Sequence, residues 1–246
     1  MDHKQTVQGY QDAAENALTY ANTLHGLFLS RPNRFIAHVK VGGKIEIAHV
    51  KNTGRCKELL IPGAKVILQK SGDPVRKTQY DLISVWKGER LINIDSQAPN
   101  KVFHEFLQSG DYIGGVTLIT REVRYGGSRF DFYIEAGERK IFIEVKGVTL
   151  EENNVAMFPD APTERGVKHI NELAGCIRDG FEAQAVFVVQ MSGVRYFTPN
   201  NKTHPAFGKA LIDAAAAGVK AIALDCLVTE NSLFVKSLVP VKLINP

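Results

Sequence analysis

The sequence is poor in the features that mark disulfide-rich, zinc-binding and membrane-spanning proteins. Its 246 residues include 3 cysteines, which are odd in number and scattered, so they indicate neither a disulfide framework nor a zinc site. No apolar run approaches the roughly 20 residues that cross a bilayer, and the N-terminus lacks the apolar core of an export signal. With 44% hydrophobic and 23% charged residues, the chain is not disordered as a whole. We expect a soluble, cytoplasmic protein with no membrane partner.

Positive charge is concentrated in one segment. Residues 31–101 contain 14 Lys and Arg against 6 Asp and Glu, although the net charge of the whole chain is only +4. A local surplus of this kind favours a polyanionic partner such as nucleic acid, because each phosphate contact releases counterions. The alternative is a solvated surface with surplus lysines.

The first hundred residues change pattern near residue 27. Residues 1–22 place apolar side chains at three- and four-residue steps, which predicts a short amphipathic helix in an N-terminal extension over 1–26. This helix is a candidate contact with the main body or with a second copy in a homodimer, and the alternative is a frayed extension. Residues 27–98 show short β-rich runs between Gly, Pro and Asn breaks, which predict a basic, OB-fold-like β-barrel. The predicted strands are Phe35–Val41, Lys44–Val50, Ala64–Lys70, Tyr80–Trp86 and Arg90–Ile94.

Basic and turn residues in or beside the loops of this barrel are candidates for contact with nucleic acid. Asn52-Thr53-Gly54 is first a turn and second a backbone nest for phosphate. Base stacking needs aromatic platforms, and Phe35, Tyr80 and Trp86 are the available rings, but each fits the core better. His49 fits the barrel interior better than a ligand site. The candidate nucleic-acid-binding residues are Arg34, Asn52, Thr53, Arg55, Lys57, Arg76 and Lys77.

Residues 99–246 alternate helical and strand patterns, which predicts a mixed sheet flanked by helices, in an α/β fold that is α+β overall. The expected order is α-β-β-β-α-β-α-β, beginning with a helix over Asn100–Gln108. Prolines predict a rigid loop over 153–165, and Thr163 is the expected N-cap of the next helix. In that helix the predicted buried stripe is Val167, Ile170, Leu173, Ala174 and Ile177, and the polar face holds Arg165, Lys168, His169 and Glu172.

Three charged residues interrupt the apolar runs of two strands joined by a Gly-containing turn. Glu144 and Lys146 share one face of the second strand because side chains alternate. With Asp131 on the first strand, two carboxylates could hold a hard divalent cation, beside an ammonium that orients a water or stabilises phosphoryl charge. The alternative is a structural ion-pair cluster, since unpaired buried charge is costly.

Several motifs resemble those of a known family. They are His49-Val-Lys-Asn-Thr-Gly-Arg-Cys, Leu60-Ile-Pro-Gly, Tyr125-Gly-Gly-Ser-Arg-Phe-Asp-Phe, Ile143-Glu-Val-Lys, Val148-Thr-Leu, Phe158-Pro-Asp-Ala and Thr163-Glu-Arg-Gly-Val-Lys-His. From Phe28 to the C-terminus the chain resembles the sugar fermentation stimulation protein family of bacteria and archaea, with Pro162 where Val is commoner. The resemblance implies an OB-fold joined to a domain similar to the PD-(D/E)xK nucleases, in DNA-binding proteins linked to maltose metabolism.

The same resemblance implies roles for individual residues. Asp131 matches the metal-binding aspartate of such nucleases, and Glu144 and Lys146 match their E-x-K. Asp131 and Glu144 would hold Mg²⁺ or Mn²⁺, and Lys146 would position or deprotonate the attacking water. Glu105 and Glu122 compete as the further acidic residue of the site. Independently of the resemblance, the candidates for contact with nucleic acid near this site are Ser128, Arg129, Arg165, Lys168 and His169. The alternatives are that Ser128 and Arg129 steady the end of the strand and that the other three form a solvated helix face.

Two functions from different classes follow from these patterns. The first is a metal-dependent nuclease that hydrolyses phosphodiesters of DNA or RNA, with DNA favoured. The second is a DNA-binding regulator of sugar metabolism that keeps the nuclease fold with little or no turnover.

Overall fold

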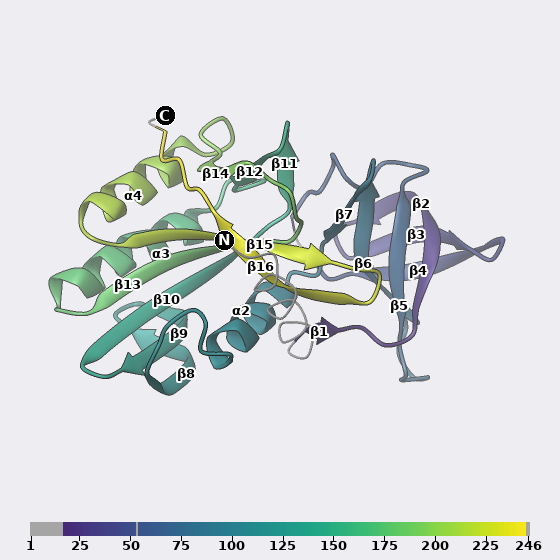
Figure 1. Ribbon diagram of the computed structural model, residues 1–246. Helices are drawn as coiled ribbons and strands as arrows, with labels where there is room; N and C mark the ends of the chain where they lie inside the picture. The colour runs from purple at the N-terminus through teal and green to yellow at the C-terminus, as the bar shows by residue number, and fades with distance from the viewer. Residues whose placement is uncertain (1–16, 53, 245–246) are drawn as a thin grey trace, which may run out of the picture. The chain divides into compact units, whose positions relative to one another are not determined.

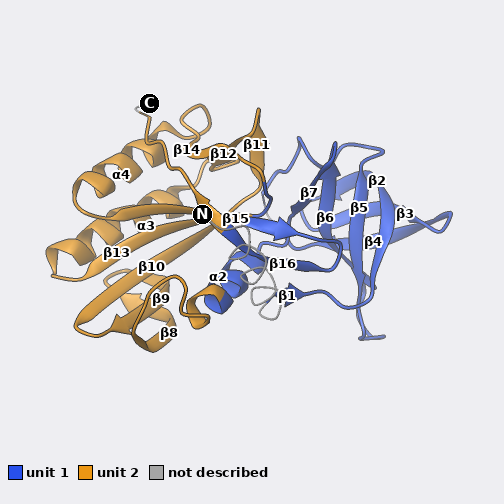
Figure 2. Cartoon of the chain, viewed as in Figure 1, with its two compact units in different colours: residues 1–105, 190–192, 226–236 blue, residues 106–189, 193–225, 237–246 orange. Residues whose placement is uncertain are grey.

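The computed structural model describes residues 17–52 and 54–244, whose packing forms two compact units (Figures 1 and 2). Unit 1 comprises residues 1–105, 190–192 and 226–236, and unit 2 comprises residues 106–189, 193–225 and 237–246. The sequence predicted a boundary between residues 98 and 99, whereas the packing divides at residue 105 and assigns two later segments to unit 1. Among the described residues, no helix is long and apolar enough to span a membrane.

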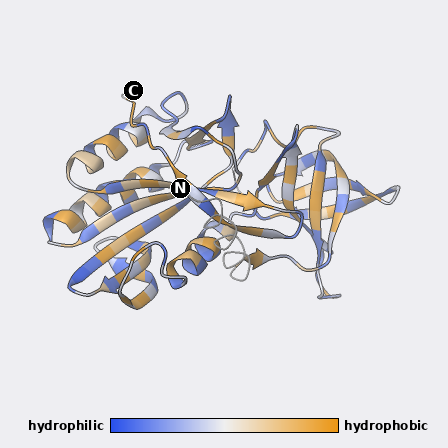
Figure 3. Ribbon diagram, viewed as in Figure 1, coloured by the Kyte–Doolittle hydropathy of each residue, from blue (hydrophilic) through white to orange (hydrophobic). Residues whose placement is uncertain are grey.

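Unit 1 contains the closed, OB-like barrel that the sequence predicted. The strand order β4-β3-β2-β5-β6-β7 is closed by a further pairing of β4 with β6, so that strands β2 to β6 form the barrel. Buried and less buried side chains alternate along β3, because one face of that strand fills the barrel, whereas β5 and β6 contain runs of consecutive buried residues. Hydrophobic residues are spread over all of these strands (Figure 3). The strands are β2 (Thr23–Asn33), β3 (Ile36–Val41), β4 (Lys44–Val50), β5 (Lys65–Lys70), β6 (Tyr80–Lys87) and β7 (Arg90–Asn93).

The predicted N-terminal helix is wrong where the structure describes it, and the rest of it lies outside the described residues. Leu18–Thr19 form strand β1, which pairs antiparallel with β16 (Ser232–Val239), and β2 already begins at Thr23. Tyr20 is buried in a cluster with Ile67, Ile83 and Leu91. Burial against distant strands therefore decides the conformation of this stretch, which its local spacing did not reveal.

Unit 2 is built on a mixed sheet whose strands there follow the order β15-β13-β10-β9-β8. Strands β8, β9 and β10 are antiparallel neighbours, and β10, β13 and β15 are parallel. Helix α3 packs against β9, β10, β13 and α4. The elements are β8 (Val116–Tyr125), β9 (Ser128–Ala136), β10 (Arg139–Val148), β13 (Glu182–Val189), β15 (Lys220–Val228), α3 (Glu164–Arg178) and α4 (Pro205–Ala216).

The connection between β10 and α3 differs from the predicted rigid loop. β11 (Leu150–Glu152) and β12 (Val155–Phe158) form a hairpin, and β12 pairs in parallel with β14 (Tyr196–Pro199) in a small separate sheet. The N-cap prediction is confirmed, because Thr163 Oγ1 accepts a hydrogen bond of 3.0 Å from the backbone N–H of Gly166. Helix α2 (Ala98–Gln108) matches the helix predicted over Asn100–Gln108.

Candidate functional site

The carboxylate of Glu144 lies at the centre of a buried charged cluster in unit 2. Strand β10 is flanked by β9 and β13, which buries Glu144 to 3% exposure. Lys146 Nζ donates to Glu144 Oε1 at 2.5 Å, as expected for two residues on one face of a strand. Burial by itself would raise the pKa of Glu144, but the hydrogen bond from His169 and the charge of Lys146 hold that pKa below its usual value.

His169 belongs to this cluster rather than to the exposed polar face of α3 on which the sequence placed it, and its contact with nucleic acid stays a prediction. The side chain is 5% exposed, and Nδ1 donates to Glu144 Oε1. Arg165 Nε donates to the other ring nitrogen, Nε2, at 3.3 Å. Because arginine has only donors, Nε2 must be the acceptor, which leaves the ring proton on Nδ1. The chain Arg165–His169–Glu144 therefore fixes the imidazole tautomer.

One oxygen of Glu144 is left without a partner. Oε1 accepts from both Lys146 and His169, whereas Oε2 is buried and accepts no hydrogen bond from any described residue. A buried acceptor left unpaired costs about 1–3 kcal/mol. The arrangement thus leaves a carboxylate oxygen that a cation could bind.

Asp131 brings a second carboxylate to the same part of the sheet. Strands β9 and β10 pair in register as far as Phe132 and Ile143, so the next residues along are Asp131 and Glu144. Asp131 Oδ2 accepts a hydrogen bond of 2.7 Å from the backbone N–H of Val145, and thereby holds the end of β9 against β10. Two carboxylates on adjacent strands fit the oxygen ligands of a hard divalent cation. The described residues contain no preformed group of three or more acidic, His or Cys ligands.

The two candidates for a further acidic residue have different surroundings. Glu105 lies on the part of α2 that belongs to unit 1, where burial raises the pKa of its carboxyl group. Glu122 lies on β8 and forms an ion pair with Arg129, Oε2 to Nε, at 2.7 Å. Both side chains of that pair are about half exposed. Arg129 is thus held by an acidic neighbour on the adjacent strand.

Three candidate phosphate contacts lie around the β8–β9 turn and the start of α3. Lys168 Nζ donates to the carbonyl oxygen of Gly127 at 2.8 Å, which ties α3 to the turn. Ser128 is buried, and its Oγ has no hydrogen-bond partner among the described residues. Arg165 is exposed at the first turn of α3. The contact of these three residues with nucleic acid stays a prediction.

In the barrel, Arg76 has a structural partner, and its contact with nucleic acid stays a prediction. Its two terminal nitrogens donate to Asp81 at 3.1 and 2.7 Å, and Lys51 Nζ lies 3.0 Å from the same carboxylate. His49 Nδ1 lies 3.3 Å from Asp81. Burial would raise the pKa of Asp81, but the hydrogen bonds and charges of Arg76 and Lys51 lower it to about 2.

Asp81→Asn is expected to lower the free energy of unfolding by about 3 kcal/mol near neutral pH, because it leaves two cations without their anion. The folded-state pKa is lowered from 3.8, so this stabilisation is complete above about pH 4 and is lost as the pH falls through about 2. Urea unfolding at neutral and acid pH measures the difference. Asp213→Asn, which breaks the exposed pair with Lys209, is the control, with an expected change of about 0.5 kcal/mol or less. Equal effects of the two variants would contradict the assignment.

Arg31 was missed by the sequence reasoning. Its guanidinium donates to four carbonyl oxygens, those of Arg34, Asn52, Gly54 and Arg55, at 2.6 to 3.0 Å. Three of these acceptors lie 21 to 24 residues away, so no local signal marks this contact. Arg31 thereby fixes the loop that carries most of the predicted barrel contacts.

Of the other barrel residues predicted to contact nucleic acid, one has a side chain held by hydrogen bonds and several have side chains exposed to solvent. Asn52 is held, since its side chain donates to the carbonyl oxygen of Ile94 and accepts from the N–H of Gly54. Thr53 lies outside the described residues. The side chains that the structure leaves exposed to solvent are Arg34, Arg55, Lys57 and Lys77.

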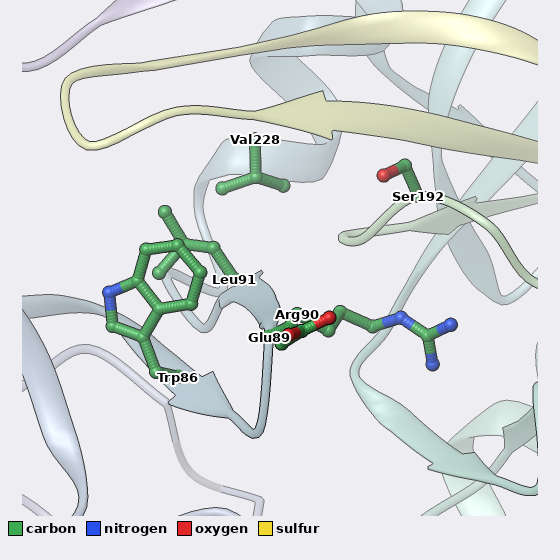
Figure 4. A pocket seen from close by; sticks show the side chains of 6 residues that line it. All are labelled: Trp86, Glu89, Arg90, Leu91, Ser192 and Val228. Carbon is green, nitrogen blue, oxygen red and sulfur yellow. The ribbon is translucent and has the colours of Figure 1, made fainter.

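A shallow hollow of about 350 Å³ in unit 1 is lined by Trp86, Glu89, Arg90, Leu91, Ser192 and Val228 (Figure 4). The indole of Trp86 packs against the cluster around Leu91, and Val228 packs against the same cluster. Trp86 therefore acts as a packing residue, as the sequence indicated.

Two family models match successive parts of the chain. A family model described as "Sugar fermentation stimulation protein RE domain" matches residues 97–232, and one described as "SfsA N-terminal OB domain" matches residues 29–94. The chain is 60% identical over 227 residues to a "Sugar fermentation stimulation protein homolog" of Desulfitobacterium hafniense (strain DSM 10664 / DCB-2), covering 92% of this chain and 99% of that protein. A homolog of the same description from Ruminiclostridium cellulolyticum is 58% identical over 226 residues, covering 92% and 100%.

A solved structure shares the fold along the chain. It is described as "The structure of Pyrococcus Furiosus SfsA in complex with Ca2+", with 32% sequence identity and a TM-score of 0.84. The match covers 92% of this chain and 98% of that one.

Proposed function

Because the chain belongs to the sugar fermentation stimulation protein family, we propose that unit 2 carries a metal-dependent site for phosphodiester hydrolysis in nucleic acid, with DNA favoured over RNA. The observation that carries this proposal is the buried Oε2 of Glu144, which accepts no hydrogen bond within the part of the chain that the structure describes. A structural ion-pair cluster would pair both oxygens, since an unpaired buried acceptor is costly. A divalent cation bound at Oε2 would satisfy it.

Asp131 and Glu144 would hold the metal, which we propose is Mg²⁺ or Mn²⁺. The family member from Pyrococcus furiosus is described in complex with Ca²⁺, another oxygen-seeking divalent cation, which supports a site of this kind. When bound, the metal would supply positive charge to a scissile phosphate and lower the pKa of a water.

Other residues of unit 2 would position the metal ligands and bind the substrate. Lys146 holds Oε1 of Glu144 and presents an ammonium group on the same face of β10, where it would orient the water. Arg165 and Lys168 put positive charge at the start of α3, near the β8–β9 turn. Phosphate oxygens of the substrate would be attracted to this end of the helix.

The direct test is incubation of the purified protein with labelled single- and double-stranded DNA and RNA. Each substrate is tested with Mg²⁺, with Mn²⁺ and with EDTA. We expect cleavage that requires the metal and stops in EDTA, with DNA cleaved faster than RNA. Absence of cleavage under every condition would contradict the proposal.

A DNA-binding regulator of sugar metabolism is the second candidate function. It is favoured by the engagement of Glu144 Oε1 with both Lys146 and His169, since a side chain held in this way is already partly neutralised. Salt-sensitive binding of DNA without cleavage would identify this alternative, because phosphate contacts weaken as salt rises.

A further inference from the structure

We propose that the outer face of strands β2, β3 and β4 binds single-stranded nucleic acid. We name it the barrel face and define it by Leu27, Lys40, Ile45 and Ile47 on these strands together with Phe35 at the β2–β3 turn. Its apolar members are exposed to solvent by 43% at Leu27, 47% at Phe35, 68% at Ile45 and 50% at Ile47. Since it names a substrate class, this inference rests on the proposed function. The residues involved are separate from the cluster around Glu144.

Strand register interleaves apolar and basic side chains across this face. Lys65 on β5 pairs with Leu27 on β2, Leu27 pairs with Lys40 on β3, and Lys40 pairs with Ile45 on β4. Residues directly opposite in such pairs lie about 5 Å apart at Cβ. The row therefore alternates a cation with an apolar side chain over four strands. A single strand offers a matching alternation, because its phosphates are charged and its unpaired bases present flat, apolar faces.

Phe35 supplies an aromatic platform at the β2–β3 turn. The sequence favoured a core role for this ring, and the structure contradicts that prediction, since Phe35 is about half exposed. The guanidinium carbon of Arg34 lies 5.1 Å from the ring centroid. A ring with a stacked guanidinium is suited to a nucleobase, because base stacking and cation–π contact then act together.

The positive charge on and beside the barrel face favours a polyanionic partner over a second copy of this chain. Lys40, Lys44, Lys65 and Arg34 form no ion pair with any described residue. In a two-fold symmetric contact the same patch meets itself, so these cations would face one another. A nucleic acid strand would neutralise them instead. Duplex DNA keeps its bases stacked inside the helix, so the barrel face should prefer single strands.

The test is fluorescence anisotropy of a labelled thymidine oligonucleotide titrated with the full chain in EDTA. Phe35→Ala and the double variant Ile45→Ser, Ile47→Ser are each expected to weaken binding about five- to tenfold, because stacking and apolar contact are lost. Lys40→Ala should reduce the slope of log affinity against log salt by about 0.7. Val75→Ser is the matched control, since Val75 is an apolar residue of unit 1 that is 87% exposed away from these strands.

Unchanged affinity in the barrel-face variants, or tighter binding of duplex than of single strands, would overturn the inference. Sedimentation measures the oligomeric state of the same variants. If they convert a dimer to a monomer and their affinity for the oligonucleotide is unchanged, the barrel face joins two copies of the chain instead. Binding is measured in EDTA, in which the proposed metal-dependent hydrolysis cannot occur, so this inference and the proposed function can fail independently of each other. The wild-type protein could bind the oligonucleotide without cleaving any substrate, and the barrel-face variants could lose that binding. This result would support binding at the barrel face and refute the hydrolytic site.

Discussion

Glu144→Ala is expected to abolish metal-dependent cleavage, lowering the rate by about 10³-fold or more, since it removes a proposed metal ligand and the anchor of Lys146. Asp131→Ala and Lys146→Ala should have similar effects, because the three groups are expected to act together. The measurement is the initial rate of cleavage of labelled DNA with Mn²⁺. Thermal unfolding of each variant checks that the fold is retained.

Glu135→Gln is the matched control for this series. Glu135 lies on β9, like Asp131, but its carboxylate accepts a hydrogen bond from the Tyr133 hydroxyl at 2.8 Å. Its removal should leave the cleavage rate within about twofold of the wild type, as expected for a group that touches no substrate. Full activity in Glu144→Ala, Asp131→Ala and Lys146→Ala would refute the site.

His169→Ala is expected to lower the affinity for Mn²⁺ about 10- to 100-fold, as loss of a group that orients a metal ligand typically does. The Nδ1–H of His169 donates to Oε1 of Glu144, so its loss frees the carboxylate to turn away. Isothermal titration calorimetry of Mn²⁺ into the protein measures this effect without any cleavage assay.

Two amide substitutions sharpen this experiment. In His169→Asn the side-chain N–H lies close to the position of Nδ1, whereas in His169→Gln it lies close to that of Nε2. Asparagine should therefore restore much of the metal affinity and glutamine should restore little. Equal affinities of the two variants would show that His169 fills space in the core and does not position Glu144.

Local periodicity predicted the charged strand of the site. The two-residue repeat places Glu144 and Lys146 on one face of β10, and the turn before Arg139 brings β9 alongside. These relations depend only on neighbours in sequence and on the geometry of a hairpin. The pairing of Asp131 with the end of β10 follows from the same hairpin.

Helix α3 shows where periodicity fails. The residues buried in the structure are Gly166, His169, Ile170, Leu173 and Cys176, so the buried stripe is rotated relative to the predicted one. Ile170 and Leu173 belong to both stripes. A histidine counts as polar in a hydropathy pattern, and its burial depends on a carboxylate 25 residues away in the chain. The prediction of His169 as an exposed residue failed for this reason.

In the barrel, too, sequence periodicity predicted some features and only the tertiary structure revealed others. Alternation predicted its later strands, but β2 was missed because its first residues continue a helical spacing. Arg76 was predicted to contact nucleic acid because it lies beside a loop in a basic segment, and its pairing with the buried Asp81 on β6 was not predicted. Arg31 was missed because its acceptors are backbone carbonyls, which every sequence contains.

The sequence by itself determined the family, the barrel followed by a mixed α/β domain, and the pair of Glu144 and Lys146 on one strand face. Motifs and periodicities are properties of residues close together in the chain. A hairpin places two such stretches side by side, so their relative positions can be predicted without knowing the rest of the fold. Only the tertiary structure decided which polar groups are partners: His169 with Glu144, Arg76 with Asp81, and Arg31 with four carbonyls. It also decided that no described residue donates a hydrogen bond to Glu144 Oε2 and that Phe35 is exposed, because burial depends on which distant elements pack together.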